Sequence, residues 1–146
     1  EITPFQDRPA HALSGGQKKQ VAIADILVMH PEVMILDEPA AALDPKHTGK
    51  VEEIVESLTA KGITVLMATH DMDYAYDWAD EIVLMHEGKV IRQGTPFEVC
   101  TDRTALEQAS LELPAVVRIY ERLKEKGRIP GDIAPPGNVD ELIAYL

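Results

Sequence analysis

Apolar residues in the first half of the chain follow two different spacings. Between residues 17 and 29, and again between 45 and 58, they recur at intervals of three or four positions, which predicts helices with one apolar face. Residues 33–36 and 63–68 are instead continuously apolar, which predicts short strands buried on both faces. Because a helix connects the two strands, we expect parallel pairing and the α/β fold class.

The second half begins with a predicted hairpin and continues with short helices. Residues 82–85 and 90–93 are strand-like and flank the turn His86-Glu87-Gly88-Lys89. Thr95-Pro96-Phe97-Glu98 is a capping box with proline at the first helical position, so a helix is expected to start there. The proline- and glycine-rich stretch 127–137 predicts a loop. The other helices predicted in this half are residues 71–79, 104–109, 115–124 and 139–145.

Two adjacent carboxylates, Asp37 and Glu38, directly follow the first apolar strand. The carboxyl ends of parallel strands line the crevice where open α/β sheets bind ligands. Paired carboxylates at this edge favour Mg²⁺, which proteins hold through one or two carboxylates, phosphate oxygens and water. The alternative is that the two charges only solvate the end of a strand.

Two further segments carry candidate chemistry. The helix start at residues 14–17 has two glycines ahead of free backbone N–H donors, which favours anion binding, although such a start is also common as a simple helix boundary. His70 follows the second apolar strand, so its imidazole is expected at the same sheet edge as Asp37 and Glu38. The alternative for His70 is a structural role at the start of the next helix.

Composition narrows the class of protein. The chain has 146 residues, a net charge of −11 and 45% hydrophobic residues, which suit a soluble globular domain with one core. The acidic balance and the lack of a basic run argue against nucleic acid as a partner. Apolar stretches fall well short of the roughly 18 residues that span a bilayer, and Cys100 is the single cysteine, so we expect a cytoplasmic protein.

Four short motifs in a fixed order resemble the ATP-binding cassette (ABC) family. LSGGQ at residues 13–17 matches the family's signature motif, and MILDEP at 34–39 matches its Walker B segment with the carboxylate beyond it. AALD at 41–44 matches its D-loop, and THD at 69–71 matches its switch histidine. The resemblance covers about residues 10–95. It implies the carboxy-terminal half of a P-loop NTPase-like cassette, with parallel strands, a hairpin and a helical tail.

The resemblance implies ATP and Mg²⁺ as cofactors and a role for each motif. Asp37 would bind Mg²⁺ through water, Glu38 would orient or deprotonate the water that attacks the γ-phosphate, and His70 would contact that phosphate. Cassettes of this family form head-to-tail dimers with a second ABC ATPase subunit, and Asp44 would link the two nucleotide sites. The residues that would close over the ATP held by the partner are Ser14, Gly15, Gly16 and Gln17.

One part of a nucleotide site is missing from the sequence. The phosphate-binding loop G-x-x-x-x-G-K-[ST] is absent, because the Gly-Lys pairs at 49–50 and 88–89 are each followed by valine. We therefore expect this chain to be the carboxy-terminal part of a cassette subunit, unable to bind or hydrolyse ATP by itself. An apolar strand such as 33–36 would then have an open edge, which predicts self-association or rearrangement.

Three stretches, 18–24, 87–99 and 111–123, resemble the ATPase subunits of energy-coupling factor importers, especially the cobalt type. This resemblance implies a cassette part, 1–96, and a helical carboxy-terminal extension, 97–146. It also implies a subunit that energises import of a metal ion such as cobalt, or of a vitamin, together with integral membrane transporter subunits at the cytoplasmic face of the membrane. Two alternatives stay open: an ATPase of the chromosome-maintenance or DNA-repair type, and a non-catalytic association module.

Overall fold

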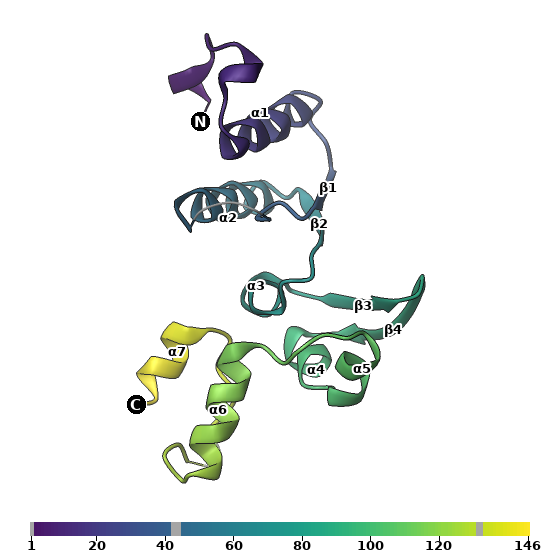
Figure 1. The fold of residues 1–146 in the computed structure, drawn as a ribbon, viewed down its shortest axis with the longest axis vertical. Coiled ribbons are helices and arrows are strands. Elements are labelled where there is room, and N and C mark those ends of the chain that lie inside the picture. The colour runs from purple at the N-terminus through teal and green to yellow at the C-terminus, as the bar shows by residue number, and fades with distance from the viewer. Residues whose placement is uncertain (1, 42–44, 131–132) are drawn as a thin grey trace. The chain divides into compact units, whose positions relative to one another are not determined.

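The computed structural model describes residues 2–41, 45–130 and 133–146 (Figure 1). The chain divides after Thr69 into two compact units, residues 1–69 and 70–146. Within the described ranges, every helix is too short or too polar to cross a bilayer.

Unit 1 has a strand–helix–strand arrangement preceded by a long helix. Its elements are the 3-10 helices η1 (Thr3–Phe5) and η2 (Ala10–Ala12), helix α1 (Gly15–Leu27), strand β1 (Val33–Asp37), helix α2 (Pro45–Thr59) and strand β2 (Thr64–Ala68). Helix α2 ends at Thr59, and the chain turns toward β2 at Gly62, which adopts a φ of +80°. The Ile63 N–H then donates to the Leu58 carbonyl at 3.1 Å, which satisfies an acceptor at the helix end.

Strands β1 and β2 pair in parallel, as predicted, from Val33 opposite Thr64 to Asp37 opposite Ala68. The expectation that β1 is buried on both faces is wrong. Burial alternates along the strand: Met34 is 1% exposed, whereas Ile35 is 69% exposed. In the described part of unit 1 the sheet contains only β1 and β2. Among the described residues of unit 1, no further strand pairs with either outer edge, and the second face of β1 is exposed. Self-association through such an open edge stays a prediction.

The buried face of this sheet packs against α2. The side chains of Val51, Val55 and Leu58 are all at most 2% exposed and recur at helical spacing along one face of α2. Helix α2 contacts β2, the strand that it leads into. Unit 1 thus holds β1 in place through one covering helix and one paired strand.

Unit 2 begins with helix α3 (Met72–Trp78) and the predicted hairpin of β3 (Ile82–His86) and β4 (Lys89–Gly94). The strands pair antiparallel, and positive φ at Glu87 and Gly88 makes the tight turn between them. The capping box at Thr95 is also confirmed, because Glu98 N–H donates to the Thr95 hydroxyl at 3.3 Å. The helices that follow are α4 (Pro96–Cys100), α5 (Arg103–Gln108), α6 (Ala115–Glu125) and α7 (Val139–Ala144).

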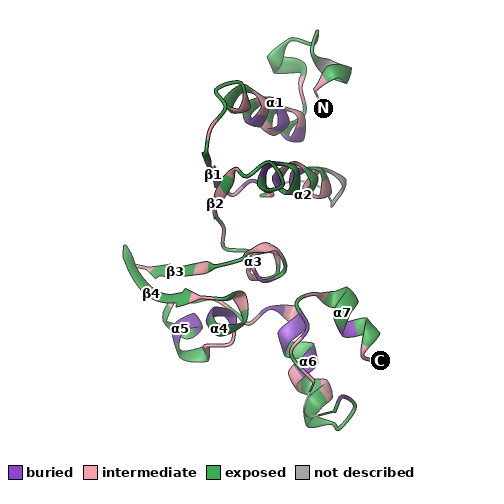
Figure 2. Cartoon of the chain, turned by 180° about the vertical axis from the view of Figure 1, so that it is seen from behind, coloured by how far each residue is buried: buried purple, intermediate pink, exposed green. Residues whose placement is uncertain are grey.

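The core of unit 2 joins α3 to the helical tail. Tyr76 of α3 packs with buried residues of α6, among them Val117 and Tyr120. Figure 2 shows buried stretches of α6 in purple. A second contact is polar, because the Asp73 carboxylate accepts a hydrogen bond from the backbone N–H of Ala115 at the start of α6. The helix that follows His70 is therefore fixed directly against the tail.

The tail also packs against the hairpin. Leu84 of β3 shares a buried cluster with Val99 of α4 and with Ala105 and Leu106 of α5.

The two compact units, residues 1–69 and 70–146, differ from the division that the sequence suggested. The family resemblance implies a cassette part, 1–96, and an extension, 97–146. That division stays a prediction.

Candidate functional site

Helix α1 begins as the sequence predicts, with Ser14 as its N-cap. The Gln17 backbone N–H donates to the Ser14 hydroxyl at 3.3 Å, and the Ser14 N–H donates to the Gln17 side-chain oxygen at 3.0 Å. These reciprocal bonds satisfy two donors and fix where the helix starts. They leave Gly15 and Gly16 in the first turn, where backbone N–H groups have no partner within the helix.

The two glycines differ in their surroundings. Gly16 is buried, whereas Gly15 is exposed and a Cβ added to it would meet no atom within 4 Å. Glycine at a helical position costs stability relative to alanine because more backbone freedom is lost on folding. The described part of this chain therefore gives no structural reason for glycine, rather than alanine, at position 15.

The two carboxylates lie at the carboxyl end of β1, as predicted. Asp37, the last residue of the strand, is exposed, and Glu38 is half-buried. Glu38 has a φ of +43°, a left-handed conformation that costs a non-glycine residue on the order of 1 kcal/mol. Its backbone N–H donates to the Ala68 carbonyl at 2.9 Å, so the end of β2 holds it in this conformation.

Two side chains hold the turn after β1. The Thr69 hydroxyl donates to Oε2 of Glu38 at 3.2 Å and restrains the carboxylate. Lys19 of α1 donates from its ammonium to the Glu38 carbonyl at 3.0 Å and to the Pro39 and Ala41 carbonyls, each at 2.9 Å. The structure thus brings the signature helix and the carboxylate turn together within unit 1.

His70 is the first residue of unit 2 and is exposed. Asp71 caps the helix that follows, because its carboxylate accepts the Tyr74 N–H at 3.0 Å. His70 lies in the short connection between β2, which ends at Ala68, and α3, which begins at Met72. The convergence of His70 with Asp37 and Ser14 stays a prediction.

The donor set fits Mg²⁺ of the kind that accompanies nucleotide phosphates. Asp37 offers an exposed carboxylate beside Glu38, and the described residues contain no group of three or more His, Cys, Asp or Glu side chains that could hold a metal ion. A site of this kind needs phosphate oxygens and water as further ligands, in agreement with Mg²⁺ chemistry. Asp44, the predicted D-loop carboxylate, lies outside the described residues.

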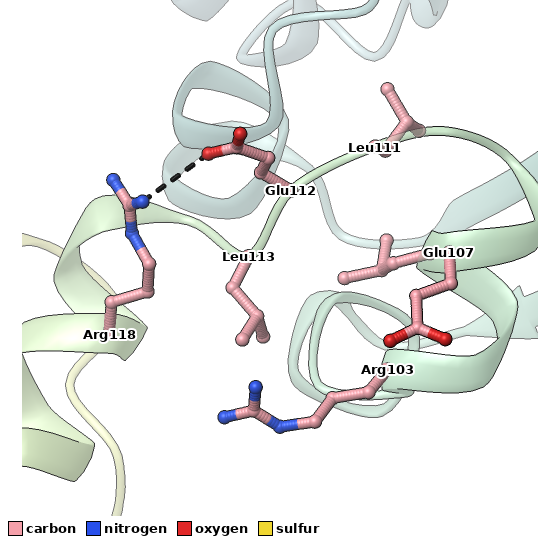
Figure 3. Close-up of a pocket in the computed structure, with 7 residues that line it drawn as sticks. Arg103, Glu107, Leu111, Glu112, Leu113 and Arg118 are labelled. Atoms are coloured by element: carbon pink, nitrogen blue, oxygen red, sulfur yellow. Dashed lines mark hydrogen bonds and ion pairs between the residues drawn. The ribbon is translucent and has the colours of Figure 1, made fainter.

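A separate cavity of about 210 Å³ lies in unit 2, between α5 and the start of α6 (Figure 3). Arg103 and Arg118 line it, but each is paired with a carboxylate: Arg118 with Glu112 at 3.3 Å, and Arg103 with Glu121. The cavity contains none of the predicted site residues. Its cations are already neutralised, so we do not assign it a ligand.

Comparison with known proteins gives a consistent result. The family model described as "ABC transporter" matches residues 1–41. An energy-coupling factor transporter ATP-binding protein of Methanocaldococcus jannaschii is 46% identical over 126 residues, which are 86% of this chain and 45% of that protein. A protein of the same description from Methanospirillum hungatei is 42% identical over 143 residues, 97% of this chain and 35% of that protein.

Solved structures agree with the sequence comparison. CbiO1 of Clostridium perfringens, described as part of the ABC transporter complex CbiONQ, has a TM-score of 0.60 at 42% identity and matches 82% of this chain and 49% of that chain. A nucleotide-free ATP-binding cassette from an ABC transporter has a TM-score of 0.67 at 32% identity, with 72% and 43% covered. This chain is similar to the ATP-binding cassettes of ABC transporters over most of its length.

The predicted fold class, part of a P-loop NTPase-like ABC cassette, is therefore confirmed, as is the resemblance to energy-coupling factor ATP-binding proteins. The chain spans about half the length of the Methanocaldococcus relative and about a third of the Methanospirillum relative. The sequence did not predict the hydrogen bonds that Lys19 and Thr69 donate to the turn after β1. Thr69 could have been found, because parallel pairing places the residue after β2 beside the residue after β1. No spacing in the sequence indicated Lys19.

Proposed function

We propose that this chain supplies the signature helix, the hydrolytic carboxylate and the switch histidine of an ATP-hydrolysing subunit that energises a membrane importer. The observation that carries the proposal is the Glu38 carboxylate, held by the Thr69 hydroxyl at the carboxyl end of a parallel strand and next to the exposed Asp37. Phosphoryl transfer depends mainly on positioning and on stabilising spread negative charge, and this arrangement suits both needs.

The proposed roles of the individual residues are those that the resemblance to ABC cassettes implies. The restrained carboxylate of Glu38 orients or deprotonates the attacking water, and Asp37 holds Mg²⁺ through water. When bound, Mg²⁺ neutralises charge on the β- and γ-phosphates. His70 contacts the γ-phosphate from the start of unit 2. Asp44 links this site to the second one.

The signature helix acts on a nucleotide held by another subunit. The N–H groups of the first turn of α1 and the Ser14 hydroxyl form an anion-binding end, and Gly15 leaves room for a close approach. We therefore propose a head-to-tail dimer with a second ABC ATPase subunit. By itself, the 146-residue chain has no phosphate-binding loop, so we expect no ATP turnover above background. Turnover by the purified 146-residue chain would contradict this.

The proposed importer is of the energy-coupling factor type. The names of the similar archaeal proteins and the CbiONQ complex of the Clostridium protein support this assignment. We propose that the subunit works at the cytoplasmic face of the membrane, against integral membrane transporter subunits, and that its cargo is cobalt, another metal ion or a vitamin. The net charge of −11 argues against nucleic acid as a partner.

The test is the change Glu38→Gln in the complete subunit, assembled with its partners. The amide keeps the size of the side chain but removes the base, so ATP should still bind while kcat falls by about 10²-fold to 10⁴-fold. Glu32→Gln is the matched control, because Glu32 is exposed at the opposite end of β1. Unchanged turnover in the Glu38→Gln subunit would remove Glu38 from this role.

A further inference from the structure

The ammonium group of Lys19 makes an unusually complete set of contacts. Its three hydrogen-bond donors face three carbonyl oxygens of the turn after β1, those of Glu38, Pro39 and Ala41, at distances of 2.9 to 3.0 Å. A lysine ammonium has three donors and no acceptor, so this turn uses its full capacity. Lys19 is half-buried, which reduces competition from water.

The contacted turn is the one that carries the hydrolytic carboxylate. Glu38 adopts a left-handed backbone conformation, and its carbonyl also accepts the Ala41 N–H at 3.2 Å. A conformation of this kind persists only where the surroundings enforce it. The Ala68 carbonyl holds the N–H of Glu38, and Lys19 holds its carbonyl, so the peptide groups on both sides of the side chain are fixed.

We propose that Lys19 is a positioning residue that sets the direction of the Glu38 carboxylate and couples it to the signature helix. This inference rests on the proposed function, because it assigns Glu38 the hydrolytic role. Lys19 lies on the same helix as Ser14 and Gly15, five and four residues after them. A movement of α1 as its amino end engages a nucleotide is therefore transmitted through the ammonium to the turn that holds Glu38.

A purely structural role would look different in kinetics. If Lys19 only stabilised unit 1, its loss would lower the amount of folded subunit and would reduce activity by the same factor whether or not Glu38 is intact. A lysine that acts through Glu38 loses its effect once the carboxylate is gone.

The experiment therefore compares three variants of the complete subunit with its partners: Lys19→Met, Glu38→Gln and the double variant that carries both changes. Lys19→Met should lower kcat by about 10-fold to 100-fold, because a small misplacement of a catalytic group has a large effect on rate, while KM for ATP changes by less than about threefold. In the Glu38→Gln background, the same change should lower the residual turnover by less than about twofold. Lys50→Met is the control, since Lys50 is an exposed lysine on α2.

A second variant covers the case in which Lys19→Met does not fold. Lys19→Gln keeps a polar side chain with good helix propensity but removes the ammonium, and it should show the same loss of kcat with KM retained. The inference is overturned if a folded Lys19 variant keeps its kcat, or if the loss is equally large in the Glu38→Gln background. An unaltered complete subunit without ATP turnover would overturn the proposed function itself, and this inference with it.

Discussion

The change Gly15→Ala adds one methyl group at the first position of α1, in a space that the chain leaves open. An ideal Cβ on Gly15 meets no atom within 4 Å, and Gly15 has no positive φ that would strain an alanine. The described part of the chain therefore gives no reason for glycine here. The proposed function gives one, because the first turn of α1 would close over the γ-phosphate of an ATP bound to the partner subunit.

The two effects have opposite signs. Alanine in place of glycine at a helical position stabilises a protein by up to about 1 kcal/mol, since the unfolded chain has less freedom to lose. For a subunit at least as long as this chain, such a gain in stability corresponds to a rise in melting temperature of about 2–4 °C at most. Turnover should fall instead, because a methyl group between backbone and phosphate displaces the nucleotide, and a shift of about 1 Å can cost on the order of 10²-fold in rate.

The assay compares thermal unfolding and ATP turnover of the complete subunit with its partners. Gly49→Ala is a matched control, because Gly49 lies within α2 and its Cβ would also meet nothing within 4 Å. We expect Gly49→Ala to raise the melting temperature by a similar amount and to leave turnover within about twofold of the unaltered subunit. Only Gly15→Ala should separate stability from activity.

The reasoning would be refuted by a Gly15→Ala subunit with full turnover, because no ligand would then approach the helix start at contact distance. A lower melting temperature for Gly15→Ala, without one for Gly49→Ala, would also contradict the reasoning. It would show that the added methyl group clashes with an atom of the subunit itself, where the structure has open space.

Further predictions concern the rest of the chain. Residues on the open sheet face, such as Ile35 and Leu66, are 69% and 57% exposed, so the 146-residue chain should self-associate in sedimentation, and lysine at both positions should reduce this. Thr95→Ala should cost about 1 kcal/mol in urea unfolding, because it removes the N-cap of α4. Hydrogen bonds from Thr95 lower the pKa of Glu98 below its usual 4.5. The stability that this carboxylate contributes is therefore present above pH 4.5 and is lost as the pH falls through the lower pKa of the folded state. Acid unfolding of the unaltered chain and of the Thr95→Ala variant would detect this loss. Burial raises the pKa of the Cys100 thiol to about 12, so a thiol reagent at neutral pH should react with it only after unfolding.

Local signals in the sequence predicted the element boundaries well. Helix starts were expected at Ser14 and at Thr95, and each side chain accepts a backbone N–H three residues later. Such caps depend on contacts between residues close in sequence, so the local pattern contains the information needed. Gly62, where the chain turns after α2, is a signal of the same local kind.

Burial of the strands was harder to predict, because it depends on partners that are distant in sequence. A run of apolar residues such as 33–36 is typical of a strand covered on both faces. In the structure Met34 and Leu36 are buried while Val33 and Ile35 are exposed, since only one face has a described covering helix. An apolar run allows a strand to be buried on both faces, whereas its actual burial depends on which other elements cover it.

The site shows the same division between local and long-range information. The sequence placed Glu38 at a strand end, yet it gave no reason for the left-handed conformation that the residue adopts there. That conformation is stabilised by a backbone bond from the neighbouring strand and by Lys19, which is 19 positions away in sequence. The lysine has no signal of its own, because its partners are backbone carbonyls, and any residue type can supply these. The backbone conformation of Glu38 therefore depends on contacts that the motif does not contain, and a matching motif with a different residue at position 19 would leave the Glu38 turn without the support of Lys19.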